Sequence, residues 1–171
     1  RWRRRSDSAL VSVVGGVADT ILRSHVVRPD MTEDTSGSGG DGVEDEVAAR
    51  IRSDAYCETL GIDLAVIEPG YAVTELVVTE DLLNFHGTPH GGAVYSVADA
   101  AFAAASNSRG DPAVALETNM SYLDAVDVGD RLTATAEETH VGGRTAEYEV
   151  EVTTDGDRVA TFRGRVYLLD D

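Results

Sequence analysis

The most regular pattern of apolar and polar residues in the chain runs from Thr145 to Val152. Ala146, Tyr148, Val150 and Val152 alternate there with Glu147, Glu149 and Glu151. An alternation with a period of two places the two sets of side chains on opposite faces of a β-strand. The segment therefore predicts a strand with one buried face and one acidic, solvent-exposed face.

Five other segments have the composition of strands. Three follow residue 112, at 113–124, 131–140 and 158–169, and the sequences Val-Gly-Gly-Arg and Asp-Gly stand at their turns. Such turns suit antiparallel hairpins. Two more segments, 62–68 and 71–78, are joined by Pro-Gly, a dipeptide that reverses the chain. The pattern predicts an antiparallel sheet.

Two segments have helical periodicity. The first runs from Val43 to about Cys57 and has acidic residues near its start, where the helix dipole favours them. The second runs from about Gly91 to Asn107 and carries a broad stripe of small apolar residues, namely Ala93, Val94, Val97, Ala98, Ala101, Ala104 and Ala105. A sheet with one apolar face needs a cover, and the second helix is the natural one. The sequence predicts an α+β domain in which the sheet curves around one long helix.

The charge of the chain is strongly acidic. It has 31 Asp plus Glu against 14 basic residues, all of them Arg, and a formal net charge of −17. Such a surface repels itself in dilute buffer, whereas molar salt shortens the screening length to about 3 Å. We expect a halophilic source, with an ordinary acidic protein that lacks Lys as the alternative. The charge argues against nucleic acid or an anionic membrane as a partner.

The first 30 residues differ from the rest, because they hold six Arg against three Asp. The basic start and short apolar run resemble an export signal, but Ser12 and two glycines interrupt the run. Met31 opens a polar, Gly-rich leader and is a candidate true start. We therefore expect residues 1–42 to be a disordered or non-native extension and residues 43–171 to form the domain.

Cys57 is the only cysteine, which indicates a reducing compartment, and we expect a cytoplasmic protein.

One segment combines a polar loop with an apolar helix: NFHGTPHGGAVYSVADAAF, residues 84–102. Its carboxylate, Asp99, sits among alanines, and burial of a carboxylate costs free energy unless a partner or a function accounts for it. A hydrogen bond to a hydroxyl such as that of Ser96 is the structural alternative. Use of the carboxylate as a general base or a nucleophile is the functional alternative.

The motif resembles the hot-dog-fold acyl-CoA thioesterases of the phenylacetate-degradation (PaaI-like) type. The resemblance rests on Asn84, on His90-Gly91-Gly92, on Asp99 eight residues after Gly91, and on Asn-Ser-Arg-Gly at 107–110. It covers about residues 57–169. It implies a sheet wrapped around a central helix, subunits that join their sheets edge to edge, and thioester hydrolysis at the subunit interface.

The resemblance also implies residue roles. The Gly91 N–H would stabilise the oxyanion, Asn84 would orient the water or the carbonyl, and Asp99 would be the base or the nucleophile. Free N–H groups and the positive end of the dipole at a helix N-terminus suit the first role, although a glycine pair also suits a tight turn. His90 would fix the loop through hydrogen bonds.

The spacing of Gly91 and Asp99 has a further consequence. Eight helical residues span about 12 Å along the axis, so the two residues cannot contact one thioester carbonyl from the same subunit. If both act on one substrate, the site must be shared between two copies of the chain. We therefore expect a dimer, or a homotetramer built as a dimer of dimers.

Other candidate residues are less specific. Arg109 and Arg144 are candidates for binding the phosphates of coenzyme A, by analogy with the family, with solvated surface arginines as the alternative. Many relatives carry a hydroxyl residue near the start of the strand after the helix to assist the water, whereas here no hydroxyl precedes Thr118, so either Thr118 serves or no residue does. His86 and His90 are four residues apart, but Gly and Pro lie between them and no third ligand is evident, so we expect no metal. Four aromatic residues are candidates for an acyl pocket or for core packing: Phe85, Tyr95, Phe102 and Tyr122.

The sequence thus predicts an acyl-CoA thioesterase. We expect it to need no cofactor, because coenzyme A is part of the substrate. The expected acyl part is an aryl or hydroxyphenylacetyl group. Two alternatives remain open. One is a hot-dog enoyl-CoA hydratase or dehydratase, against which the His-Gly-Gly and Asp99 arrangement speaks. The other is a non-catalytic acyl-CoA-binding protein.

Overall fold

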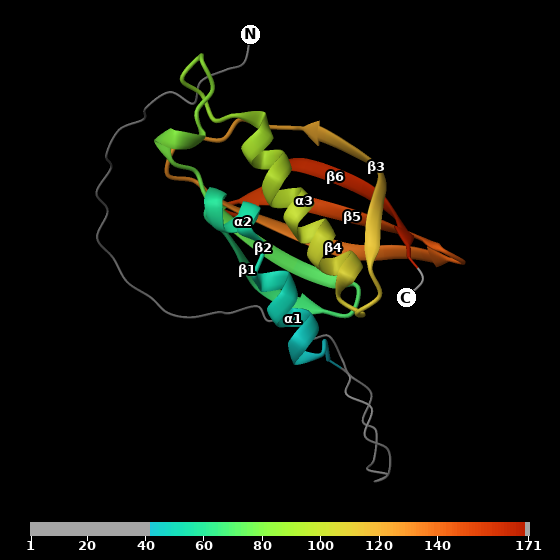
Figure 1. Cartoon of the computed structure of the whole chain (residues 1–171). Helices are drawn as coiled ribbons and strands as arrows, with labels where there is room; N and C mark the ends of the chain where they lie inside the picture. Colours follow the sequence, from blue (N-terminus) through green and yellow to red (C-terminus); the bar gives the residue numbers. More distant parts are fainter. Residues whose placement is uncertain (1–41, 170–171) are drawn as a thin grey trace, which may run out of the picture. The chain divides into compact units, whose positions relative to one another are not determined.

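The structure is a computed structural model, and it describes residues 42–169 (Figure 1). The expected extension at residues 1–42 therefore lies almost wholly outside the described residues, as does Met31, and the domain boundary at residue 43 stays a prediction. The described part holds one six-stranded sheet in the order β1-β2-β4-β5-β6-β3, with every neighbouring pair antiparallel. The strands are β1 (Ile62–Glu68), β2 (Tyr71–Val77), β3 (Ala113–Tyr122), β4 (Arg131–Gly142), β5 (Thr145–Thr154) and β6 (Asp157–Leu168).

All six strands and their hairpins agree with the periodicity of the sequence. In β5, residues Ala146, Tyr148, Val150 and Val152 are buried, whereas the glutamates between them face the other side of the sheet. The alternation therefore predicted both the strand and its buried face correctly.

The long helix α3 (Gly91–Asn107) crosses the inner face of the curved sheet, as Figure 1 shows. Ten of its residues are buried, and they include all seven members of the predicted small apolar stripe. Phe102 is 2% exposed and packs edge-on against Tyr148 and, tilted, against Phe162. The predicted α+β hot-dog architecture is confirmed.

Gly164 in β6 fixes how closely the helix approaches the sheet. A Cβ atom built on Gly164 would lie 2.6 Å from Cζ of Phe102, closer than real side chains come to one another. Only glycine leaves room for the ring at this strand position. The close packing of α3 on β6 therefore depends on glycine at this position.

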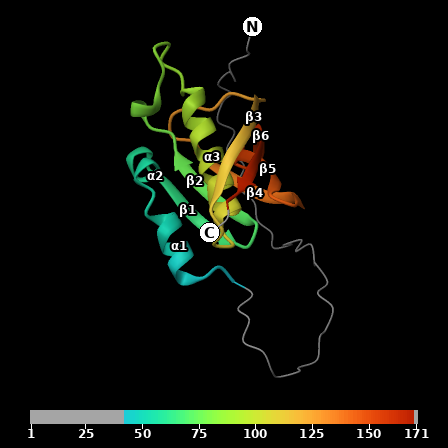
Figure 2. The same ribbon diagram turned by 45° about the vertical axis from the view of Figure 1, so that its right-hand side comes forward.

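The predicted helix from Val43 to Cys57 is wrong as a single helix. The structure has α1 (Asp45–Arg52) and α2 (Ala55–Leu60), both beside β1 (Figure 2). The Asp54 carboxylate accepts hydrogen bonds from the N–H groups of Tyr56 and Cys57 at 2.8 and 3.1 Å. An aspartate that caps a helix start in this way favours an N-terminus over a helix interior, so the chain restarts at Ala55.

Strand β3 is an edge strand of the sheet and is open to solvent. Seven of its ten residues are exposed, among them Val114 at 46% and Leu116 at 51%. An edge of this length with apolar side chains is a surface on which another strand can pair.

Candidate active site

The N-terminus of α3 is built by the His-Gly-Gly sequence. His90 is the N-cap, and its Nδ1 atom accepts a hydrogen bond from the Gly92 N–H at 2.8 Å. The N–H of Ala93 donates to the His90 carbonyl at 2.9 Å. Within residues 42–169 the Gly91 N–H donates to no acceptor. The helix therefore presents one free donor at its positive end, which is the geometry that an oxyanion site needs.

Asn84 shapes the loop that leads to this donor. Its Oδ1 atom accepts from the His86 N–H at 2.8 Å, and its Nδ2 atom donates to Thr88 Oγ1 at 2.9 Å. The Asn84 N–H also donates to the Thr88 carbonyl at 2.8 Å. Asn84 thus closes the loop on itself as an Asx turn. The short 3-10 helix η1 (Glu80–Leu82), which the sequence pattern did not predict, leads into the loop.

Asp99 lies half-buried on α3 without a hydrogen bond or an ion pair within the described residues. Ser96, the alternative partner, uses its hydroxyl to donate to the Gly92 carbonyl and to bond the Tyr56 hydroxyl. Burial raises the pKa of the Asp99 carboxyl, and the nearby Asp54 raises that pKa further. A carboxylate whose proton affinity is raised by its surroundings is suited to accept a proton.

Asp99 and Gly91 are not brought together within one chain. Both lie in the single straight run of α3, so the helical rise keeps them about 12 Å apart. The free N–H and the unpaired carboxylate therefore face separate surroundings in one subunit, as their spacing predicted.

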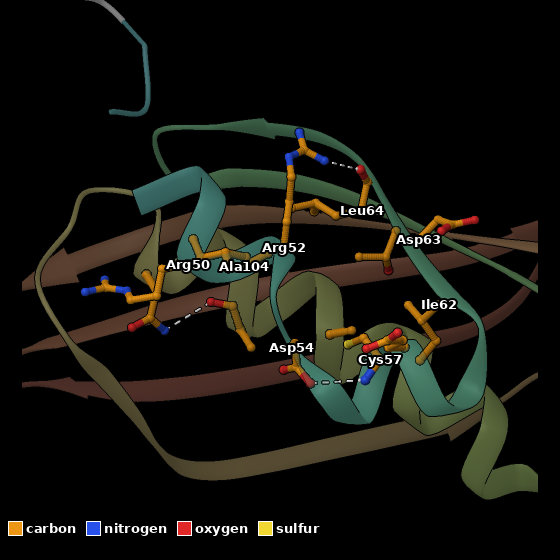
Figure 3. A pocket seen from close by; sticks show the side chains of 14 residues that line it. Arg50, Arg52, Asp54, Cys57, Ile62, Asp63, Leu64 and Ala104 are labelled. Carbon is orange, nitrogen blue, oxygen red and sulfur yellow. Dashed lines mark hydrogen bonds between the residues drawn. The ribbon is translucent and has the colours of Figure 1, made fainter. Parts of the chain in front are cut away.

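A cavity of about 520 Å³ opens between α3, β1 and the two short helices (Figure 3). Its floor on α3 consists of Ala100, Ala103 and Ala104, and Ile62 and Leu64 of β1 add apolar side chains. Charged residues form the rim: Arg50, Arg52, Asp54, Glu58 and Asp63.

This cavity lies next to Asp99. Asp54 and Cys57 line it, and both interact electrostatically with the Asp99 carboxylate. Burial, followed by Asp54, raises the pKa of the Cys57 thiol to about 11, so the thiol stays protonated and unreactive at neutral pH. Cys57 therefore acts as a small wall residue.

Two tyrosines attach β3 to the first turns of α3. The Tyr122 hydroxyl donates to the Gly91 carbonyl at 2.9 Å, and the Tyr95 hydroxyl bonds Thr118 Oγ1 at 2.6 Å. Thr118 is the candidate for assisting the water, and its hydroxyl is therefore bonded to Tyr95, which lies one helical turn before Asp99 on α3. Its role stays a prediction.

The two candidate phosphate-binding arginines lie away from the start of α3. Arg109 bonds Glu138 at 2.6 Å, just beyond the opposite end of the helix. Arg144 donates to the Tyr167 hydroxyl at 2.8 Å and stacks on that ring, in the turn between β4 and β5. Residue 109 follows Gly91 by 18 positions, or about 27 Å at the rise of a helix. Arg144 lies at the end of the sheet where Leu168 pairs with Ala113, whereas Gly91 is bonded by Tyr122 at the other end of β3.

The remaining candidates divide between core and surface. Phe102 belongs to the core, whereas Phe85 is 93% exposed at the loop tip and its ring lies 4.0 Å from that of His86. Among residues 42–169, no group of three or more His, Cys, Asp or Glu side chains is arranged to hold a metal ion. The absence of a metal and of a cofactor stays a prediction.

Sequence reasoning missed Asp54 as a neighbour of Asp99. The Ser-Asp pair before Ala55 is a helix-start signal, and attention to it would have placed α2 correctly. The proximity of α2 to Asp99, in contrast, is a tertiary contact without a local signal.

The comparisons with known proteins identify the family of this chain. The model of the thioesterase superfamily matches residues 86–161, which include the start of α3 and Asp99. The acyl-coenzyme A thioesterase PaaI of Escherichia coli is 42% identical over 122 residues, which cover 71% of this chain and 87% of that protein. Its solved structure has a TM-score of 0.69 at 40% identity and covers 72% of this chain and 90% of its own.

Two further solved structures are similar. A variant of the phenylacetic acid degradation protein PaaI from Thermus thermophilus is 46% identical, with a TM-score of 0.66, and the match covers 68% of this chain and all of that one. The protein smu.793 from Streptococcus mutans, solved bound to acetyl CoA, is 27% identical with a TM-score of 0.61 and coverages of 64% and 90%.

The hot-dog fold and the named relatives together identify a thioester hydrolase. The chain belongs to the thioesterase superfamily. None of the helices between residues 42 and 169 is long and apolar enough to cross a membrane.

Proposed function

We propose that this protein hydrolyses an acyl-CoA to the free acid and CoA, in sites shared between two subunits. The observation that carries the proposal is the pair of unpartnered groups on α3, the Gly91 N–H and the Asp99 carboxylate. The Escherichia coli relative, named as an acyl-CoA thioesterase, supports the substrate class.

Gly91 and Asp99 have different roles in the proposed reaction. The thioester carbonyl oxygen accepts a hydrogen bond from the Gly91 N–H of one subunit, which stabilises the negative charge that develops there. Asp99 of the other subunit either takes a proton from the attacking water or attacks the carbonyl carbon itself. If Asp99 is the base, the oxygen of water bonds the acyl carbon, the C–S bond breaks, and the proton taken by Asp99 passes to the CoA thiolate. If Asp99 is the nucleophile, an anhydride between Asp99 and the acyl group forms as the C–S bond breaks, and water then hydrolyses the anhydride to the acid and the free carboxylate and supplies the proton of the CoA thiol.

The edge strand β3 supports the shared site. It is one of the two edge strands of the sheet, so one side of its backbone is unpaired within residues 42–169, and the side chains of Val114 and Leu116 are exposed. Antiparallel pairing of two β3 strands about a two-fold axis would cover these groups and bring the Gly91 end of one subunit toward the partner. Further pairing of dimers would give a tetramer.

The cavity beside Asp99 supports an aryl or arylacetyl group as the acyl part. Ala103, one helical turn after Asp99, lines this cavity, so an acyl group whose carbonyl is at Asp99 can extend into it. The small side chains there leave space for a ring.

The charge of −17 supports a salt-rich cytoplasm as the working environment.

The test is release of free CoA from acetyl-, benzoyl- and phenylacetyl-CoA by the full chain in molar KCl, followed by chromatography so that Cys57 does not contribute to a thiol signal. Release from at least one substrate, abolished in Asp99→Asn, is expected. A folded oligomer that binds these esters without releasing CoA would be the non-catalytic binding protein. Hydration of crotonyl-CoA without thiol release would indicate the hydratase.

A further inference from the structure

The Gly91–Gly92 peptide lies between two side chains that come from different parts of the fold. On one side, the Tyr122 hydroxyl of β3 donates to the Gly91 carbonyl at 2.9 Å. On the other side, the N–H of the same peptide, which belongs to Gly92, donates to His90 Nδ1 at 2.8 Å. The carbonyl and the N–H of one peptide unit are electronically coupled, so the three groups form one hydrogen-bonded chain.

The two glycines are what allows this arrangement. A Cβ atom on Gly91 would lie 3.3 Å from Cζ and Oη of Tyr122, and a Cβ atom on Gly92 would lie 2.8 Å from His90 Nδ1. Each glycine therefore gives one of the two rings access to the peptide. The His-Gly-Gly sequence is thus explained by side-chain contacts on both sides of the backbone as well as by the turn.

The hydrogen bond to Nδ1 determines where the imidazole carries its proton. An Nδ1 atom that accepts a hydrogen bond carries no proton, so neutral His90 carries its proton on Nε2. Within residues 42–169, Nε2 has no partner. His90 therefore holds a free N–H donor one residue before the free N–H of Gly91.

We propose that Tyr122 is a positioning residue for thioester hydrolysis, which holds His90 through the Gly91–Gly92 peptide so that its Nε2–H becomes a second donor to the thioester oxygen. The inference rests on the proposed function. Donation from Tyr122 to the carbonyl polarises the peptide, and a polarised peptide has a stronger N–H donor for Nδ1. Burial raises the pKa of the Tyr122 hydroxyl, which keeps it protonated as a donor.

The fold offers a matched control in Tyr56. Tyr56 and Tyr122 are 60% and 50% exposed, and both bond the first turns of α3 through their hydroxyls. Tyr56 bonds Ser96 Oγ, which donates to the Gly92 carbonyl, and that carbonyl belongs to the next peptide. Removal of the Tyr56 hydroxyl therefore leaves intact the peptide whose N–H bonds the His90 ring, because the next peptide contacts only the His90 backbone carbonyl, through the Ala93 N–H.

The experiment measures hydrolysis of the preferred acyl-CoA by Tyr122→Phe, Tyr56→Phe, His90→Gln and the double variant Tyr122→Phe/His90→Gln. Loss of one oxyanion donor lowers kcat by about 100-fold or more. Tyr122→Phe keeps the donor and loosens only its position, so its effect should be smaller. We expect Tyr122→Phe to lower kcat about tenfold with KM changed less than about twofold, and Tyr56→Phe to change neither by more than about twofold. In the His90→Gln background, Tyr122→Phe should have almost no further effect, because residues that act through one another are not additive.

Two measurements separate positioning from a structural role. The ¹⁵N NMR signals of His90, assigned by their loss in His90→Gln, should show the Nε2–H tautomer in the wild type and a mixture of tautomers in Tyr122→Phe. Light scattering should show the same oligomeric mass for the wild type and for Tyr122→Phe. Unchanged tautomer populations, additive effects in the double variant, or a loss of kcat that coincides with dissociation would each overturn the proposal. Since the NMR measurement needs no turnover, it tests Tyr122 even if the wild type hydrolyses no acyl-CoA, an outcome that would contradict the proposed function instead.

Discussion

Asp54 lies close enough to Asp99 for its negative charge to raise the pKa of the Asp99 carboxyl, in addition to the larger effect of burial. A catalytic base must be ionised, so a raised pKa moves the acidic limb of the activity profile to higher pH. The Asp54 carboxylate, which caps α2, thus affects the ionisation of Asp99 on α3.

Replacement of Asp54 by Asn should move the acidic limb of kcat/KM to lower pH. Asn keeps an oxygen acceptor for the helix cap but removes the negative charge, so the pKa of Asp99 falls toward its ordinary value. The pH–rate profiles of the wild type and Asp54→Asn, measured at one salt concentration, check this. An unchanged acidic limb would show that Asp54 does not act on the ionisation that controls the rate.

Asp99→Asn should remove most turnover and also stabilise the fold near neutral pH. A carboxyl with a raised pKa in the folded state binds more protons folded than unfolded, so its ionisation at neutral pH lowers the free energy of unfolding. Asn has nearly the same shape and carries no charge, so it removes this loss of unfolding free energy. Thermal unfolding at pH 7 should show a higher midpoint for Asp99→Asn than for the wild type. The exposed Asp111→Asn is the control and should change neither activity nor midpoint; a lower midpoint for Asp99→Asn would contradict the stated effect of burial.

The sequence predicted the strands and the central helix well because their signals are local. The alternation in β5 and the apolar stripe of α3 each record which side of an element is buried. The break at Asp54 has a local signal too, but the helical spacing of Val47, Ile51 and Ala55 outweighed it in the prediction.

The site was predicted only in part because its connections are tertiary. The motif identified Gly91, Asn84 and Asp99, but nothing near residue 122 in the sequence indicates that its hydroxyl reaches Gly91, 31 positions away. Likewise, Arg109 was a candidate for phosphate binding, and its bond to Glu138 could not be read from either segment alone. Local patterns define elements, whereas contacts between elements decide which side chains meet.

Ala103→Leu should exclude large acyl groups and keep small ones. Ala103 is exposed on α3 and lines the cavity beside Asp99, so a longer side chain there fills space without disturbing the core. We expect kcat/KM for phenylacetyl-CoA to fall by about tenfold or more and that for acetyl-CoA to change less than about twofold. Ala49→Leu on α1 makes the same change at an exposed helical alanine outside the cavity and should affect neither substrate. An equal loss for both substrates in Ala103→Leu would place the acyl group elsewhere.

The free energy of unfolding should rise steeply with salt. The formal charge of −17 repels itself over about 30 Å in 0.01 M salt but over only about 3 Å in 1 M salt. Thermal unfolding of the full chain should therefore shift to higher temperature as KCl is raised, whereas an uncharged osmolyte such as sucrose should give a smaller shift. Equal midpoints at 0.01 M and 1 M KCl would argue for an ordinary acidic protein.

Mixed dimers test whether Gly91 and Asp99 act across the interface. Gly91→Pro removes the N–H at the first helical position, where proline is well accepted after a residue with an extended backbone. Its Cβ atom, which would lie 3.3 Å from Cζ and Oη of Tyr122, also crowds that side chain, so both effects act on the Gly91 end of the site. Gly91→Pro and Asp99→Asn should each be nearly inactive alone.

After the two variants exchange subunits in equal amounts, half of the dimers contain one of each. In a shared-site dimer, one of the two sites then combines an intact Gly91 with an intact Asp99, and the other site carries both changes. Activity should therefore return to about a quarter of that of the wild type. If each subunit instead used its own Gly91 and Asp99, every site would carry one change and no activity would return, so a mixture that stays inactive after mass spectrometry has shown the exchange would contradict the shared site.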